Sequence, residues 1–313
     1  MALLENVLLL LLGFAVLLKA SEYSVKALVR VAAHFRITEF LVSFFVVGFA
    51  SIVPELFIGV RSALHGDSAL GMGVIIGSNV IDLTLILGIV ALVGRRVPIK
   101  SKFARKNYGF LAMATLPFLM VLDGVISSFD GAVLVLGYSV YAFSLMRASF
   151  SHTTLLSMPS QEKLSVLRQA ALAVAAIAAL MVSAELIVSN ALAISDQLSL
   201  PLIFTGLFIV AAGTCLPELS FSLRALKEKH KELAIGDVIG NVALDSTFSL
   251  GVVALVMPIT PVFHLAVIST VFMAFAALLS FIFMNEGKEL TWREGIGLIA
   301  LYFVFATVEF LVK

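Results

Sequence analysis

The chain has 313 residues, of which 61% are hydrophobic and only 13% are charged. Its mean hydropathy is +1.10 and its formal net charge is +1. A soluble fold needs a charged surface, so these values exclude a soluble domain, a disordered chain and a nucleic-acid-binding protein with a basic face. A single cysteine, Cys215, excludes an internal disulfide and cannot build a thiolate metal site alone. The composition predicts an all-α polytopic membrane protein whose main partner is the lipid bilayer.

Ten apolar segments are long enough to cross a bilayer as helices, which takes about 20 residues. In chain order they lie near residues 4–33, 38–62, 68–94, 107–126, 130–148, 166–194, 199–224, 232–257, 261–284 and 294–312. The first segment is not expected to be a cleaved signal peptide, because it has neither a basic start nor a small-residue cleavage site.

Basic residues gather in alternate loops. They cluster at 95–106 and 227–231, whereas the loops around Asp123 and Asp196 contain no Lys or Arg. By the positive-inside rule the basic loops are cytoplasmic. This pattern predicts that both termini lie outside the cytoplasm.

The sequence matches itself without a gap at a shift of 163 residues. Over residues 48–98, 17 of 51 positions are identical to those of residues 211–261. The identities include Pro54-Glu55-Leu56 with Pro217-Glu218-Leu219, Gly77 with Gly240, and Asp82 with Asp245. Shared apolar composition does not explain matched Pro, Glu, Asp and Gly residues, so we interpret the match as a duplication.

Each half holds five predicted helices, so the second half starts from the opposite side of the membrane. The expected architecture is two inverted five-helix repeats, residues 1–148 and 166–313, joined by a cytoplasmic linker at 149–165. Secondary transporters use inverted repeats for alternating access. A monomer is sufficient for such a mechanism.

Four carboxylates are predicted to lie at mid-membrane, two in each repeat: Glu55, Asp82, Glu218 and Asp245. An ionised carboxylate there costs several kcal/mol unless it is paired or solvated. Lys and Arg are nearly absent at that depth, so metal cations or protons are the expected partners. Carboxylate oxygens are hard ligands that suit Ca²⁺, Mg²⁺ or Mn²⁺, and no His or Cys cluster points to zinc or copper.

Helix breakers accompany the two glutamates. Pro54 and Pro217 each remove a backbone donor and so free carbonyl groups of the preceding turn. Free carbonyls at membrane depth are tolerated where they line a polar cavity, and there they can coordinate a cation. The carbonyls concerned belong to Ala50, Ser51, Gly213 and Thr214. The repeated glycines, Gly73 and Gly77 in one half and Gly236 and Gly240 in the other, are expected to allow close helix approach or a second helix break.

Two further repeated pairs are charged. Arg61 and Arg224 lie nearly two turns after the glutamates, and we interpret them as anchors at the membrane interface. Glu22 and Glu185 lie in the first helix of each half, where we expect a structural or vestibule role.

These motifs resemble the two α-repeats of the calcium/cation antiporter superfamily. Residues 50–55 (ASIVPE) with 77–82 (GSNVID) look like the first α-repeat, and 213–218 (GTCLPE) with 240–245 (GNVALD) look like the second. The pattern is most similar to that of prokaryotic sodium/calcium exchangers, Gly-Thr-Ser-x-Pro-Glu followed by Gly-Ser-Asn-x-x-Asn/Asp. The resemblance covers the whole chain and implies ten helices in two inverted halves, whose long first helices slide across the core. It also implies a prokaryotic-type plasma membrane as the location.

The resemblance also implies roles for single residues. Glu55 and Glu218 would be the central Ca²⁺ ligands, completed by the carbonyls of Ser51 and Thr214 and flanked by Asp82 and Asp245. Supporting positions would be Ser78, Asn241, Ala50, Gly213, Cys215, Pro54 and Pro217. No cofactor is implied beyond the transported ions.

The sequence departs from the exchanger pattern where sodium-coupled relatives bind Na⁺ through hydroxyl groups. The serine expected two residues before each proline is Ile52 in one half and Cys215 in the other, and the serine expected after Gly240 is Asn241. Both halves carry an aspartate, and four carboxylates crowded in a low dielectric cannot all stay ionised. We therefore expect Ca²⁺/H⁺ antiport, with Na⁺/Ca²⁺ exchange as the alternative.

Two other classes of protein fit the sequence less well. A cation channel gives no reason for inverted repeats with proline-broken helices. An enzyme is not expected, because no Ser/His pair or His-Glu-x-x-His set is present. An intramembrane aspartyl protease would leave both glutamates unexplained.

Overall fold

The computed structural model describes residues 2–34, 52–99, 108–149, 163–227, 231–286 and 289–312, and these are almost entirely helical. The helices of the first half are α1 (Ala2–His34), α4 (Val53–Leu64), α5 (Ser68–Ile81), α6 (Leu87–Gly94), α8 (Tyr108–Met120) and α9 (Ser128–Ser149). A π-helical segment, η2 (Asp82–Ile86), joins α5 to α6 without a break, so residues 68–94 form one long helix.

The described residues of the second half of the chain are also mostly helical. Its helices are α10 (Lys163–Gln197), α11 (Leu202–Phe204), α12 (Ala211–Thr214), α13 (Leu216–Lys227), α14 (Lys231–Leu244), α15 (Leu250–Val256), α16 (Phe263–Glu286) and α17 (Trp292–Val312). Two more π-helical segments, η3 (Thr205–Val210) and η4 (Asp245–Ser249), join α11 to α12 and α14 to α15.

Short strands connect the two halves. β1 (Arg96–Pro98) and β2 (Glu289–Thr291) pair antiparallel, with Arg96 opposite Thr291. Arg96 Nη1 also lies 3.8 Å from Glu289 Oε1. A single further bridge joins Ile126 to Ile259.

Seven helical stretches within the described ranges are long and apolar enough to cross a membrane, and Tyr108–Met120 is apolar but shorter. Residues 35–51, which hold most of the second expected span, lie outside those ranges, so the count of ten stays a prediction. One expected boundary was wrong: α8 ends at Met120 rather than near 126, because the chain turns at Gly124, whose φ of +89° is in the left-handed region that favours glycine.

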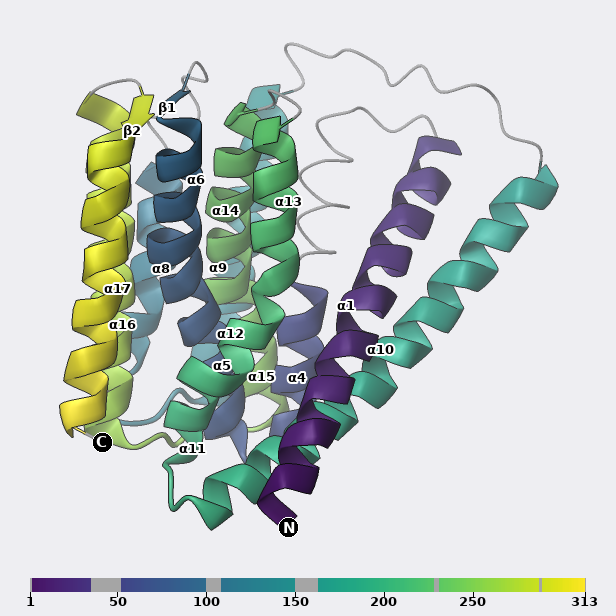
Figure 1. The fold of residues 1–313 in the computed structure, drawn as a ribbon, viewed down its shortest axis with the longest axis vertical. Coiled ribbons are helices and arrows are strands. Elements are labelled where there is room, and N and C mark those ends of the chain that lie inside the picture. Colours follow the sequence, from purple (N-terminus) through teal and green to yellow (C-terminus); the bar gives the residue numbers. More distant parts are fainter. Residues whose placement is uncertain are drawn as a thin grey trace.

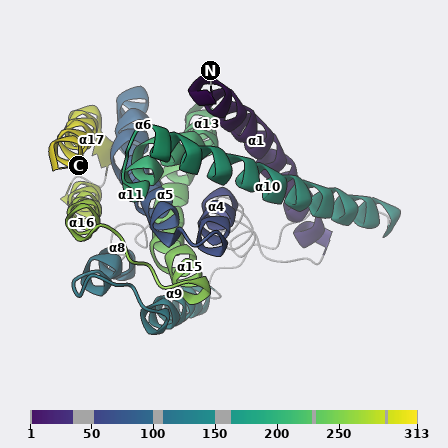
Figure 2. The ribbon, with the colours of Figure 1, turned by 90° about the horizontal axis from the view of Figure 1, so that it is seen from below.

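Figure 1 shows the helices standing side by side, with the N- and C-termini at one end of the molecule and the β1–β2 pair at the other. The long helices α1 and α10 pack along each other as a pair. Seen from below in Figure 2, this pair lies along one side of the remaining helices.

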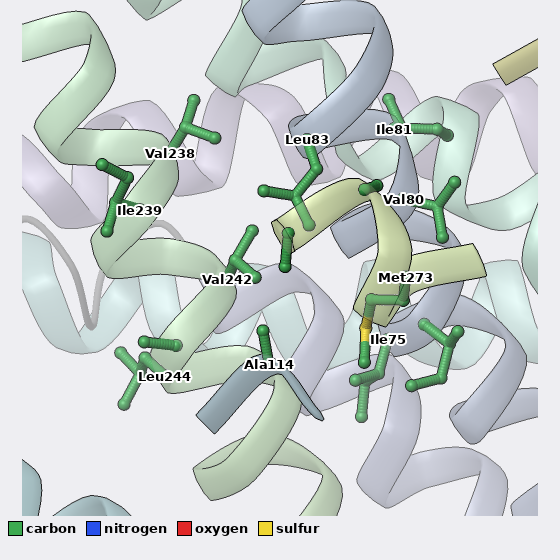
Figure 3. Packing of buried hydrophobic residues seen from close by; sticks show 14 of the residues in the cluster. Ile75, Val80, Ile81, Leu83, Ala114, Val238, Ile239, Val242, Leu244 and Met273 are labelled. Atoms are coloured by element: carbon green, nitrogen blue, oxygen red, sulfur yellow. The ribbon is translucent and has the colours of Figure 1, made fainter. Parts of the chain in front are cut away.

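Most of the core belongs to the bundle beside this pair. Figure 3 shows Val238 and Val242 of α14 facing Leu83 of η2, with Ala114 of α8 and Met273 of α16 close by. A second, smaller apolar cluster contains Leu17 of α1, Ile187 of α10, Ile58 of α4 and Val210 of η3. The α1–α10 pair therefore packs on the bundle through a cluster separate from the main core.

The expected close helix approach is confirmed for Gly73 and Gly77. It was wrong for Gly236 and Gly240, where an added Cβ atom would meet no atom of the described residues within 4 Å. A Cβ atom at Gly73 would lie 2.2 Å from Ile203 O, and one at Gly77 would lie 2.5 Å from Leu207 O. Only glycine lets α5 pack this tightly against the backbone of α11 and η3. This contact holds α5, which carries Ser78, against the segment that leads to Thr214.

Candidate cation-binding site

Both predicted glutamates lie in the first turn of a helix that begins in the interior of the protein. Glu55 follows Pro54 at the start of α4, and Glu218 follows Pro217 at the start of α13. Their side chains are only 2% and 4% exposed. A helix N-terminus carries partial positive charge, which favours a carboxylate there.

The expected helix break is present in the second half. α12 ends at Thr214, Cys215 forms a turn, and α13 begins at Leu216. Pro217 has no N–H to donate to Gly213 O. The equivalent residues of the first half, Ala50 and Ser51, lie outside the described ranges.

Hydroxyl groups from both halves of the chain meet at Glu55. Ser78 Oγ of α5 donates to Glu55 Oε1 at 3.4 Å and lies 3.1 Å from Thr214 Oγ1 of α12. Cys215 Sγ is 3.7 Å from Ser78 O. Four predicted residues on three helices and a turn are therefore in contact, although Thr214 and Cys215 are more than 130 residues from Ser78 in sequence.

The two aspartates each begin a π-helical segment. Asp82 is the first residue of η2 and Asp245 is the first residue of η4, and their side chains are 0% and 1% exposed. Asn241 Nδ2 of α14 donates to Asp82 Oδ2 at 2.9 Å, which ties the two halves together a second time. Glu218 and Asp245 each lie within electrostatic range of both Glu55 and Asp82.

Five buried oxygens of this region accept no hydrogen bond from the described part of the chain. They are Glu55 Oε2, Glu218 Oε2, Asp82 Oδ1, Asp245 Oδ1 and Asn241 Oδ1. An unmet buried acceptor costs about 1–3 kcal/mol, and more when it is charged. Oxygens of this kind are satisfied by a cation or, on the carboxylates, by protons.

The described side chains also limit how one ion can be held. No three His, Cys, Asp or Glu residues among them lie close enough together to share a metal ion. Ca²⁺ takes six to eight oxygen ligands. An ion with this many ligands, held at this arrangement, would need hydroxyl, amide and carbonyl oxygens as well as carboxylates.

Helix α1 reaches the site at Gly213. A Cβ atom on Gly213 would lie 2.3 Å from the ring of Phe14, so this ring packs directly on the backbone beside Thr214. Ile52, which replaces an expected serine, is fully buried and offers no side-chain oxygen.

One residue expected to be an anchor also forms an ion pair. Arg61 Nη2 pairs with Glu185 Oε2 of α10. The sequence did not indicate this pair, because the two residues are far apart in the chain and meet only through packing of α4 on α10. The interpretation of Arg61 as an anchor at the membrane interface stays a prediction.

Sequence reasoning also missed Glu309 of α17. Its side chain is fully buried, and neither carboxylate oxygen has a hydrogen-bond partner within the described ranges. An acid inside the apolar run of residues 295–312 was the available signal.

A bundle of apolar helices with buried, unsatisfied carboxylates on broken helices defines an integral membrane protein that handles cations. The model of the family described as "Sodium/calcium exchanger protein" matches residues 5–147 and 169–311. The chain belongs to this family, a branch of the calcium/cation antiporters. Its members are transporters, so the chain is a cation antiporter and not an enzyme.

Individual relatives are similar over most of their length. The sodium/calcium exchanger MaX1 of Methanosarcina acetivorans is 26% identical, covering 97% of this chain and 98% of the relative. The inner membrane protein YrbG of Escherichia coli is 27% identical over 80% of this chain and 79% of its own. A solved structure of the sodium-calcium exchanger NCX_Mj, soaked with 10 mM Na⁺ and zero Ca²⁺, shares the fold with a TM-score of 0.68 at 24% identity, covering 97% of this chain and 99% of that one.

Proposed function

We propose that this antiporter exchanges Ca²⁺ for H⁺ by alternating access at the buried carboxylates. The observation that carries the proposal is the set of five unpartnered oxygens on Glu55, Glu218, Asp82, Asp245 and Asn241. A Ca²⁺ ion would be bound by oxygens of this set, and protons would satisfy its four carboxylates. Each would exclude the other because both use the same carboxylates.

In this proposal Ca²⁺ binds between Glu55 and Glu218. The carbonyls of Ser51 and Thr214 complete the site, and the hydroxyls of Ser78 and Thr214 supply neutral oxygens at its edge. Asp82 and Asp245 flank the ion and take up protons when it leaves. The supporting positions are Ala50, Gly213, Cys215, Pro54, Pro217 and Asn241.

Na⁺/Ca²⁺ exchange is the second candidate. It is favoured by the contact between Ser78 and Thr214, which keeps one pair of hydroxyl oxygens at the site. The relative MaX1 is named a sodium/calcium exchanger. Against it, Ile52 and Cys215 remove two hydroxyls, and a thiol is a poor ligand for hard Na⁺.

We further propose that ten helices form two inverted repeats, residues 1–148 and 166–313, around a cytoplasmic linker at 149–165. The family model matches the two halves separately. At the same shift of 163 residues, Asp82 and Asp245 both begin π-helical segments. The positions of the Ile126–Ile259 bridge are the repeat mates of Glu289 and Arg96, which belong to the strand pair.

The proposal places both termini outside the cytoplasm. Both lie at one end of the molecule (Figure 1), as an even number of crossings requires. The basic loops at 95–106 and 227–231 are then cytoplasmic. A monomer contains every residue of the proposed site.

Transport by the purified protein in proteoliposomes tests the coupling ion. We expect an imposed pH gradient to drive Ca²⁺ uptake in the complete absence of Na⁺. Uptake that requires an outward Na⁺ gradient and ignores the pH gradient would replace this proposal with the second candidate. Ca²⁺ flux that dissipates its own gradient with neither counter-ion would indicate a channel.

A further inference from the structure

One carboxylate ties the α1–α10 pair to the helix that begins with Glu55. Glu185 of α10 pairs with Arg61 of α4 through its Oε2 atom, and its Oε1 atom lies 3.1 Å from His65 Nε2. Ser189 Oγ donates to the same Oε1 atom at 3.1 Å. Arg61 Nη2 is also 3.4 Å from His65 Nε2, so the three side chains form one network.

This network is rigidly connected to the proposed site. Glu55 and Arg61 lie on the same helix, six residues apart, which is about 9 Å of helix rise. Any shift of α10 along the bundle must therefore break the bonds of Glu185 or carry α4 with it. The apolar contacts of α10 resist such a shift less than the bonds of Glu185 do, because apolar side chains have no directional bonds and can slide and repack.

We infer that Arg61, His65 and Glu185 form a latch that holds α10 against α4 in one of the two access states. The inference rests on the proposed alternating access, which requires that some contacts differ between the two states. The structure described here shows the latch closed.

The sequence repeat identifies the contact of the opposite state. In an inverted repeat, exchanging the conformations of the two halves converts one access state into the other. The repeat mates of Arg61 and Glu185 are Arg224 of α13 and Glu22 of α1. By this symmetry, the contact that replaces the latch in the opposite state would join Glu22 of α1 to α13. In the closed-latch structure Glu22 lies 3.4 Å from Lys19, one turn away on its own helix.

The distance between α4 and α10 reports the latch directly. Spin labels on Leu64 and Val182, which are 62% and 69% exposed, lie on these two helices and outside the network. Cys215 is buried, so the full chain with two added cysteines can be labelled and reconstituted. Pulsed electron-spin distance measurement then gives the populations of the two states.

We expect Glu185→Gln to lower the population with the described α4–α10 distance, relative to the other state, by roughly two- to fivefold, as the loss of a half-exposed ion pair allows. Glu22→Gln should raise the same population. Reversing both charges, Arg61→Glu with Glu185→Arg, should restore the wild-type ratio. Glu5→Gln, an exposed acid on α1, is the matched control and should change nothing.

An unchanged α4–α10 distance distribution in Glu185→Gln would overturn the latch. If Glu22→Gln shifted the distribution in the same direction as Glu185→Gln, the symmetric counterpart of the latch would be overturned. Arg61→Gln removes the cationic partner of Glu185. If Glu185→Gln does not fold, the same distance measurement on Arg61→Gln tests the latch instead. The readout requires no transported ion. A protein that shows these shifts but carries no Ca²⁺ would retain the latch and lose the proposed function.

Discussion

The proposed function depends on the buried carboxylate oxygens of Glu55, Glu218, Asp82 and Asp245. Each acid has one oxygen without a partner among the described residues, while the hydrogen bonds from Ser78 and Asn241 hold Glu55 and Asp82 in place. A site built for stability would not leave four buried acceptors unmet. Under the proposed function, these acids reduce stability in return for binding ions that arrive and leave.

Replacing either glutamate with glutamine should abolish Ca²⁺ transport without unfolding the protein. Glu55→Gln and Glu218→Gln keep the shape of the side chain but remove one of the two central charges, so we expect at least a tenfold loss of Ca²⁺ flux, equivalent to about 1.4 kcal/mol or more of binding free energy. The midpoint temperature of thermal unfolding should stay the same or rise, because each substitution removes an unpaired buried charge. Glu5→Gln is the control, and retained flux in both glutamine variants would refute the assignment of the site.

Restoring the missing hydroxyls should move the protein toward sodium coupling. In the double variant Ile52→Ser with Cys215→Ser, one hydroxyl oxygen returns just before α4 and one just before α13. Hard Na⁺ prefers oxygen ligands to sulfur. We expect a Na⁺ gradient to stimulate Ca²⁺ uptake in this variant more than in the parent. The pair Ile52→Ala with Cys215→Ala removes the same side chains without adding oxygen. Equal Na⁺ stimulation in the two pairs would contradict the explanation.

At the scale of elements, broken and π-helical segments place the site. The break at Cys215 puts Glu218 in a first helical turn, and η2 and η4 begin at Asp82 and Asp245. The glycine contacts of α5 then fix the distance between Ser78 and Thr214. Packing of this tightness leaves no room for a methyl group.

Gly77→Ala should therefore destabilise the bundle. The new Cβ atom would lie 2.5 Å from Leu207 O and 2.7 Å from Leu207 Cα, both backbone atoms, so the helices must separate at a cost of about 1–3 kcal/mol. Gly297→Ala is the matched control, because a Cβ atom on this helical glycine meets nothing within 4 Å and alanine is the better helix former. Thermal unfolding in detergent measures the stability of both variants. An equal change in the midpoint temperature for the two substitutions would contradict the packing argument.

Sequence reasoning succeeded where the signal was local. Pro217 predicted the break at Cys215, and Gly73 and Gly77 predicted close packing of α5. It could not give the bond between Asn241 and Asp82 or the pair of Arg61 with Glu185, because these residues are more than 120 positions apart and meet only in the folded chain. The π-helical segments were also missed, since no composition signal distinguishes them from an α-helix.

At the scale of the molecule, the α1–α10 pair and the bundle are the two parts that a transport cycle would move. They have separate apolar clusters, and the network of Glu185 joins them. The site belongs to the bundle, except that Phe14 of α1 packs on Gly213 beside Thr214. Movement of the pair is therefore expected to change access to the site while the bundle keeps its ligands together.

The central claim is that Ca²⁺ and protons compete for the same buried carboxylates. Adding Ca²⁺ to the purified protein in weakly buffered detergent solution, with a pH indicator present, tests this claim directly. We expect Ca²⁺ binding to release protons, and we expect the release to disappear in Glu55→Gln with Glu218→Gln. Ca²⁺ binding without any proton release, across the pH range in which the protein transports, would contradict it.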